Sequence, residues 1–114
     1  MVEEHGSERF TAALVPMPNG RSMRRAGRHD REVDVVVDRD GKPYQRFVIV
    51  VDRRLLRSID ADEDETTARA MVMVMESAIK QRFADGSVPA PTEIELRLTD
   101  ERALAAAVRS MKAD

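Results

Sequence analysis

The sequence contains no cysteine and no tryptophan, and its other aromatic side chains are three phenylalanines and one tyrosine. Without cysteine the chain cannot form disulfides, thiolate nucleophiles, iron–sulfur clusters or cysteine-ligated zinc sites. With so few aromatic residues, the core must be built from valine, leucine, isoleucine, alanine and methionine, and the seven methionines make such a core adaptable. We expect no cofactor and no metal.

Long apolar segments are also missing. No run approaches the roughly 20 apolar residues that a membrane span needs, and the first residues, Met-Val-Glu-Glu-His, lack the apolar core of a signal peptide. We therefore expect a cytoplasmic protein with no membrane contact. The 114 residues, 42% hydrophobic and 35% charged, fit a disordered N-terminus over 1–9 and a single domain over 10–114.

Charge is distributed unevenly along the chain. The net charge is only −2, yet residues 21–31 contain five arginines and one aspartate. This segment has no sustained hydrophobic period, so we expect an Arg-rich loop over 19–31. It is a candidate surface for a partner or for phosphate groups, carried by Arg21, Arg24, Arg25, Arg28 and Arg31. The alternative is a solvated loop paired with the acidic remainder of the same protein, or with the Asp60–Glu65 cluster of another copy.

Three β-strands are predicted in the first half of the chain. Phe10–Val15 has the composition of a short strand that ends at Pro16. A β-hairpin then pairs Glu32–Asp38 with Tyr44–Asp52 around Asp40-Gly41. A three-residue loop sets Val35 beside Phe47 and Val33 beside Ile49, which separates apolar from polar side chains. The buried face is then Val33, Val35, Val37, Phe47, Ile49 and Val51.

Two helices and one more strand follow. A helix over Glu63–Ala84, capped by Asp60 or Asp62, places one apolar stripe toward the core. The alternating segment Glu93–Leu98 predicts a strand, and a last helix begins at Thr99 as its cap. The fold class is α+β, with a small antiparallel-rich sheet in the order β-β-β-α-β-α covered by one long helix, and a C-terminal helix. The predicted helical stripes are Ala68, Met71, Val72, Met75, Ala78, Ile79 and Phe83, then Leu104, Ala107, Val108 and Met111.

The middle of the long helix is apolar on nearly all sides, over Met71-Val72-Met73-Val74-Met75. A sheet on one side would leave part of this surface exposed, so something should cover the other side. We predict a contact between two copies through Met71, Met73 and Val74, since methionine suits such surfaces. Cover by the C-terminal helix, or a few scattered exposed apolar residues, are the alternatives.

Patterns typical of catalysis are sparse. The histidines are His5 and His29, and no serine lies in a Gly-x-Ser-x-Gly turn. The run from Asp60 to Asp64 begins like a calcium loop, but its sixth and twelfth positions are Glu65 and Met71 instead of glycine and glutamate. We assign no catalytic and no metal-binding residue, and the sequence favours a protein that is not an enzyme.

One segment resembles a known family. The long helix, the link Phe83-Ala84-Asp85-Gly86-Ser87-Val88-Pro89-Ala90-Pro91 and the strand Glu93–Leu98 are similar to the corresponding stretch of HicB-like antitoxins, whose small sheet-plus-helix domain binds a toxin partner. The similar part covers barely a third of the chain. The segment between Val51 and Asp60 lacks the Pro-Asp-Leu-Pro-Gly type of turn, and no DNA-binding tail follows, so we do not assign the family.

These observations favour a non-enzymatic protein-interaction or regulatory module that forms a homodimer. Its contact would be the methionine-rich helix or a sheet edge, with a protein partner docked by the arginine loop. The first alternative is a small nucleic-acid-associated regulator that uses Arg21–Arg31. The second alternative is a small-molecule-binding or catalytic domain with a pocket between the sheet and the long helix.

Overall fold

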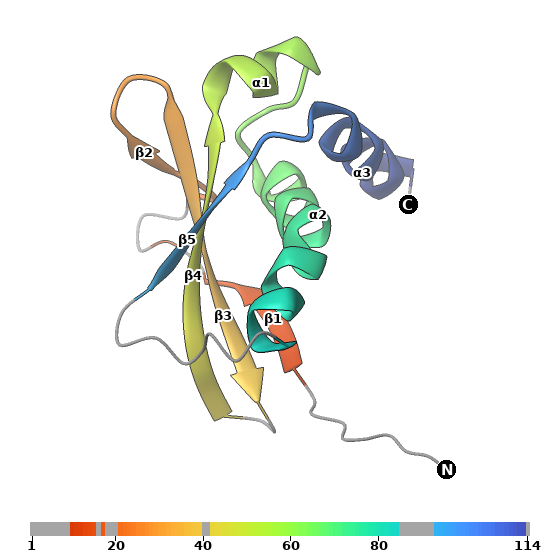
Figure 1. The fold of residues 1–114 in the computed structure, drawn as a ribbon. Coiled ribbons are helices and arrows are strands. Elements are labelled where there is room, and N and C mark those ends of the chain that lie inside the picture. The colour runs from red at the N-terminus through yellow and green to blue at the C-terminus, as the bar shows by residue number, and fades with distance from the viewer. Residues whose placement is uncertain (1–9, 16, 18–20, 40–41, 85–92, 114) are drawn as a thin grey trace.

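The fold was determined as a computed structural model, which describes residues 10–15, 17, 21–39, 42–84 and 93–113. The described residues form four successive strands, two helices, a fifth strand and a third helix, which confirms the predicted α+β class (Figure 1). The predicted N-terminal segment 1–9 lies outside the described residues. The elements are β1 (Phe10–Leu14), β2 (Arg24–Ala26), β3 (Asp30–Arg39), β4 (Lys42–Asp52), α1 (Arg53–Ser58), α2 (Glu65–Ala84), β5 (Ile94–Leu98) and α3 (Glu101–Ala113).

All five strands belong to one sheet in the order β1-β3-β4-β5, and the short β2 also pairs with β3. Since β4 occupies one side of β3, strands β1 and β2 share the other side, one at each end of β3. The pairs made by β3 are antiparallel, whereas β5 runs parallel to β4. The helices α1 and α2 make the crossover that a parallel neighbour requires.

The central hairpin has the predicted register. Val35 pairs with Phe47 and Val33 with Ile49, and all six residues predicted for the inner face are buried. We predicted that a three-residue loop sets this register. In the structure Arg39 pairs with Lys42, and a bulge beside Val37 and Asp38 shifts the register instead. The turn residues 40–41 themselves lie outside the described residues.

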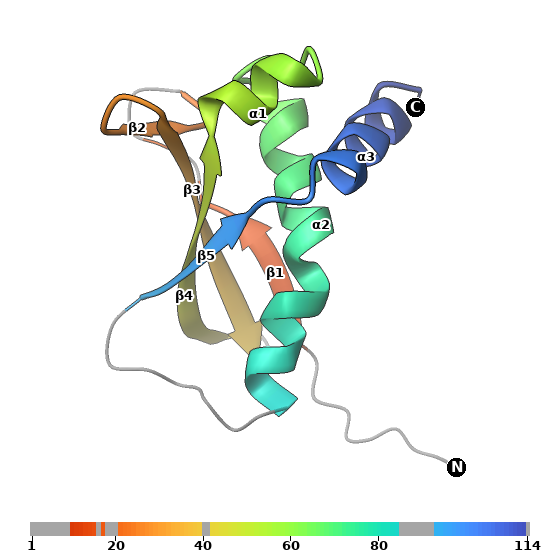
Figure 2. The ribbon, with the colours of Figure 1, turned by 45° about the horizontal axis from the view of Figure 1, so that its top comes forward.

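The helices cover one face of the sheet, and α3 lies against α2 (Figure 2). The predicted stripes are confirmed: Ala68, Met71 and Ile79 of α2 and Leu104, Ala107 and Val108 of α3 are buried, and the other described stripe residues pack against them. The side chain of Phe83 lies outside the described part. No described helix combines the length and the apolar character that crossing a bilayer requires.

The helix starts differ from the prediction, because in each case the aspartate directly before the helix is the cap. The side chain of Asp64 accepts a hydrogen bond from the Thr67 N–H (3.0 Å), so the cap of α2 is neither Asp60 nor Asp62. Likewise Asp100 accepts from the Ala103 N–H (3.0 Å), and Thr99 is not the cap of α3.

The short helix α1 was not predicted. Asp52 caps it by accepting a hydrogen bond from the Arg54 N–H (2.7 Å). Its end is marked by Asp60, which has a φ of 57° and is a residue type that tolerates the left-handed region. The Ala61 N–H then donates to the Leu56 carbonyl oxygen (2.9 Å), which turns the chain toward α2. Six residues are too few to give a readable helical period.

Candidate functional site

The arginine-rich segment forms part of the sheet, whereas the sequence predicted a loop. Arg24–Ala26 make the strand β2, which pairs with Asp30–Glu32 through a tight turn. Gly27 in this turn has a φ of 76°, a conformation that glycine adopts at little cost. The backbone hydrogen bonds of this hairpin fix where each arginine side chain lies, so the five candidate residues do not act as one flexible arm.

Arg24 is held by two carboxylates of β3. Its guanidinium donates to both oxygens of Asp34 (3.0 Å each) and to Oε1 of Glu32 (2.6 Å). These hydrogen bonds, that of Asp34 foremost, raise the pKa of Arg24. Burial acts to raise the pKa of Asp34, but the ion pairs with Arg24 and Arg46 outweigh it, so that this pKa is lowered.

Similar ion pairs extend over the sheet face that the helices leave open. Arg46 Nη2 lies 3.2 Å from Asp34 Oδ2, and Arg97 Nη2 lies 2.8 Å from Asp30 Oδ2. Val48 and Val50 point to this same face, yet they are only 5% and 1% exposed. The aliphatic stems of long arginine side chains can cover apolar strand residues while the charged groups stay in water. We therefore interpret this face as closed by its own ion pairs.

Arg31 is removed from solvent altogether. Its side chain points to the helical side of the sheet and is 3% exposed, and its Nε donates to Oε1 of Glu63 (2.8 Å). A second guanidinium nitrogen donates to the carbonyl oxygen of Asp30 (2.9 Å). Arg31 therefore pairs with an acidic residue of its own chain, as the alternative interpretation of the sequence expected, but as part of the sheet and not as a solvated loop.

Two of the five arginines, Arg25 and Arg28, are exposed, and no described residue forms a hydrogen bond or ion pair with their side chains. The turn that contains Arg28 is tied to α1, because the Arg53 N–H donates to the carbonyl oxygen of His29. The Nε of Arg53 is buried without a hydrogen-bond partner. Arg57 lies one helical turn further along α1 and is exposed. We call Arg25, Arg28, Arg53 and Arg57 the basic end.

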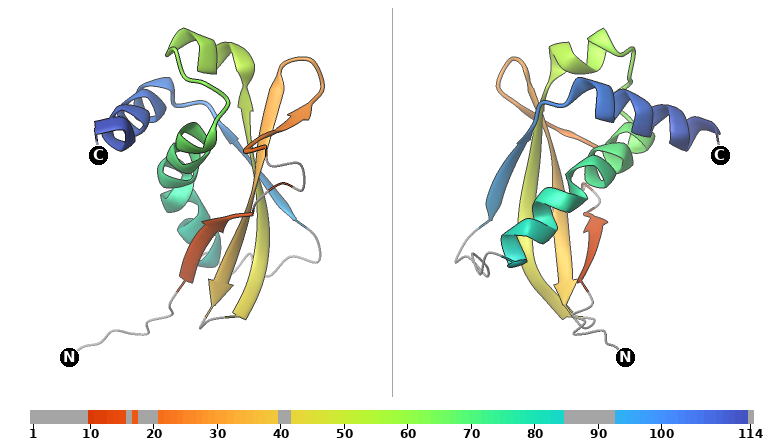
Figure 3. Two further views of the ribbon diagram at one scale, coloured as in Figure 1. Left: turned by 180° about the vertical axis from the view of Figure 1, so that it is seen from behind. Right: turned by 45° about the vertical axis from the view of Figure 1, so that its right-hand side comes forward.

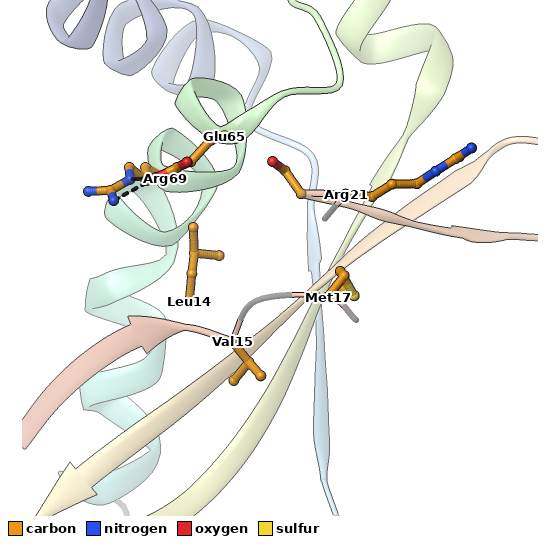
Figure 4. A pocket seen from close by; sticks show the side chains of 7 residues that line it. Leu14, Val15, Met17, Arg21, Glu65 and Arg69 are labelled. Carbon is orange, nitrogen blue, oxygen red and sulfur yellow. Dashed lines mark hydrogen bonds and ion pairs between the residues drawn. The ribbon is translucent and has the colours of Figure 1, made fainter. Parts of the chain in front are cut away.

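The remaining candidate, Arg21, lines a cavity of about 210 Å³ between the end of β1 and the start of α2 (Figure 4). Arg69, bound to Glu65 at 2.6 Å, borders the same space, and Leu14 and Val15 supply its apolar wall. A second cavity of about 320 Å³ shares Leu14 and Arg69 with the first. A third, of about 480 Å³, shares Arg21 and Ser22 with it. Together they form a groove beside β1, which we call the β1 groove.

The outer edge of β1 offers unpaired backbone groups. The Val15 N–H donates to the Asp34 carbonyl oxygen (2.9 Å), so the residues whose backbone groups point to β3 are 11, 13 and 15. The N–H and C=O of Ala12 and Leu14 therefore point away from the sheet. No described strand pairs with this edge, and Figure 3 shows β1 as the outermost strand.

The predicted contact between copies is altered by the structure. Met71 is fully buried inside the single chain and cannot touch a second copy, because it packs in the core. Val74 is partly buried against the same core, and α3 covers α2, as the alternative interpretation proposed. Met73 is 48% exposed, and it is the only large hydrophobic residue of the described chain that is exposed.

Ionisable side chains also gather near His29. Asp30 and Asp52 face each other across β3 and β4, and each is bound by an arginine. The hydrogen bonds from Arg97 to Asp30 and from Arg54 to Asp52 lower the pKa of both carboxyls. Among the described residues no three acidic, histidine or cysteine side chains are placed to hold a metal ion. His5 lies outside the described part of the chain.

Comparison with protein-family models, with curated proteins and with solved structures gives no match. The resemblance of the helix-to-strand segment to HicB-like antitoxins thus receives no support from these comparisons. The class that the observations define is a small α+β module, and its role must be argued from the two surfaces described above.

Proposed function

We propose that this protein is a non-enzymatic interaction module that forms a homodimer by pairing β1 of one copy with β1 of another. The observation that carries the proposal is the edge of β1 with which no described strand pairs, where the backbone groups of Ala12 and Leu14 face the β1 groove. Unpaired backbone groups at an exposed edge readily accept another strand. This contact is the sheet-edge interface considered from the sequence.

The composition of β1 suits pairing with itself. In a two-fold antiparallel pair the same strand supplies both sides, so a charged residue near the two-fold axis would lie close to its own copy. The strand Phe-Thr-Ala-Ala-Leu carries no charge and has no proline. Natural edge strands that must stay single usually carry lysine, proline or an inward-pointing charge, and β1 has none of these.

The helix α2 supports the same arrangement. A two-fold axis normal to the sheet puts α2 and its copy on the same face of the enlarged sheet. Arg69 and Val72 line the β1 groove, and Met73, four residues after Arg69, lies on the same side of the helix. The exposed Met73 would therefore be covered by the second copy, and burial of its side chain would add to the dimer contact.

Light scattering on the purified protein at micromolar concentration tests the proposal. Ala12→Pro removes an N–H that points outward and leaves the hydrogen bonds between β1 and β3 intact, so it should give a folded monomer. Met73→Asp should also shift the protein toward monomer. Ser110→Asp, an exposed position on α3 with the same change of charge, is the control and should remain dimeric. A monomeric wild type, or a dimer that Ala12→Pro leaves unchanged, contradicts the proposal.

A further inference from the structure

The basic end shares no residue with the β1 groove and presents cations with which no described carboxylate forms an ion pair. The β2–β3 hairpin and α1 lie together at one end of the sheet, joined by the hydrogen bond between the Arg53 N–H and the His29 carbonyl oxygen (Figures 1 and 2). We propose that this end binds the phosphate backbone of double-helical nucleic acid through Arg25, Arg28, Arg53 and Arg57.

The basic end carries more positive than negative charge. Three of its carboxylates are engaged by other arginines: Asp30 by Arg97, Asp52 by Arg54, and Glu32 by Arg24. Two more, the exposed Asp60 after α1 and Glu101 beside Ser58 (2.6 Å), add two negative charges against the four arginines of the basic end. Arg25, Arg28 and Arg57 are exposed and make no ion pair with any described residue. A local excess of positive charge therefore remains on a chain whose net charge is −2, and such an excess attracts polyanions irrespective of net charge.

The cations of the basic end are guanidinium groups, which suit phosphate. Every side chain of the basic end is an arginine, whose planar fork of donors matches a phosphate better than the point charge of lysine does. The Nε of Arg53 is buried and lacks an acceptor within the described structure. A buried donor without a partner costs free energy, so turning the Arg53 side chain outward to a phosphate oxygen would recover the missing hydrogen bond.

The surroundings of the basic end favour nucleic acid over other anionic partners. A lipid surface or a protein partner normally requires an apolar anchor as well as charge. The one large hydrophobic residue exposed in the described chain is Met73, which lies on α2 and not at the basic end. No aromatic residue lies at the basic end to stack on an unpaired base, so a duplex backbone suits it better than a single strand does. Recognition by arginine forks alone is independent of base sequence.

Fluorescence anisotropy with a labelled DNA duplex of about two helical turns, titrated at several salt concentrations, tests this proposal. Each phosphate contact contributes a slope of about −0.9 to log K against log salt concentration, so four arginines predict about −3.6. The variant Arg25→Ala, Arg28→Ala, Arg57→Ala should bind at least about ten-fold more weakly and lose about three-quarters of that slope. Arg28→Glu alone should weaken binding further than Arg28→Ala does.

The matched control is Arg102→Ala, Arg109→Ala, Lys112→Ala, which removes the same charge from exposed positions on α3. This control should bind the duplex within about two-fold of wild type, because its lower net charge has only a small long-range effect on binding. Equal weakening of both triple variants, absence of duplex binding at low salt, or equally tight binding of poly-glutamate or anionic vesicles would overturn the proposal. The monomeric Ala12→Pro variant should still bind one duplex site per chain, which keeps this result distinct from the dimer.

Discussion

Arg24 and Asp34 form a two-pronged ion pair in which Nη1 and Nη2 of the guanidinium each donate to one carboxylate oxygen at 3.0 Å. In the strand register Arg24 lies opposite Glu32, and Asp34 lies two residues further along β3. The ion pair with Asp34 therefore links the short strand β2 to the middle of β3. The side chain of Asp34 is only 9% exposed and also accepts a hydrogen bond from Arg46. One carboxylate thus fixes arginines from two neighbouring strands.

Replacing this carboxylate by its neutral isostere should destabilise the fold. Asp34→Asn keeps the shape but removes the charge that Arg24 and Arg46 share. Since Arg24 is partly exposed, the loss should lie between that of a surface pair and that of a buried pair, about 1–2 kcal/mol of unfolding free energy. Urea denaturation measures it. Asp62→Asn, at an exposed loop position, should change stability by less than about 0.5 kcal/mol.

The protein should become less stable in acid, because its aspartate–arginine ion pairs are lost when the carboxylates are protonated. The pKa values of Asp30, Asp34 and Asp52 are all lowered in the folded state by arginine partners. Their contribution is therefore present above the unfolded aspartate pKa of about 3.9 and is lost as the pH falls through the lower folded values. The urea midpoint should hold steady down to about pH 5 and decrease below about pH 4. A midpoint unchanged at pH 3 would refute this assignment, and Asp34→Asn should show a smaller acid loss.

The contact between Arg31 and Glu63 should show coupling. A guanidinium that is 3% exposed and bound to a carboxylate at 2.8 Å is stabilised by that partner more than a surface pair would be. In a double-mutant cycle with Arg31→Met and Glu63→Gln, we expect a coupling energy of about 1 kcal/mol. Chemical denaturation of the four proteins gives the value. A coupling near zero would mean that burial of Arg31 depends on packing and on the Asp30 carbonyl alone.

The turn of the β2–β3 hairpin should depend on its glycine. A Cβ at Gly27 would meet no atom within 4 Å, so substitution there changes only the backbone energy. At a φ of 76° alanine should cost about 1 kcal/mol, whereas asparagine should cost less, because it tolerates this region. Thermal unfolding of Gly27→Ala and Gly27→Asn separates the two. Equal stability of both variants would show that the hairpin tolerates either residue there.

Much of the fold was predictable because long elements repeat their pattern. The ten residues of β3 and eleven of β4 alternate strongly enough to fix the pairing of Val35 with Phe47. The twenty residues of α2 show a helical period over several turns. In contrast, β2 has three residues and α1 has six, and elements this short depend on partners distant in sequence.

The fate of each arginine was beyond sequence analysis for a related reason. Arg24, Arg25 and Arg31 look alike in a basic run, yet one is bound to Asp34, one is free of any described partner and one is buried against Glu63. Alternation along β2 and β3 sends neighbouring side chains to opposite faces, and these faces meet different carboxylates. Composition alone indicated that the segment was basic, but only the strand pairing separates the cations that can meet a ligand from those that hold the sheet.

The parallel neighbour β5 joins the sheet by a long crossover, while β3 and β4 are adjacent in sequence as well as in the sheet. The hairpin can therefore nucleate locally, at little cost in chain entropy, whereas β5 must wait until α2 has closed a loop of some forty residues over the same surface. A hairpin formed before the helices pack would expose Phe47 and Ile49, which are buried in the folded protein. Chains at high concentration are most prone to aggregate at this stage of folding.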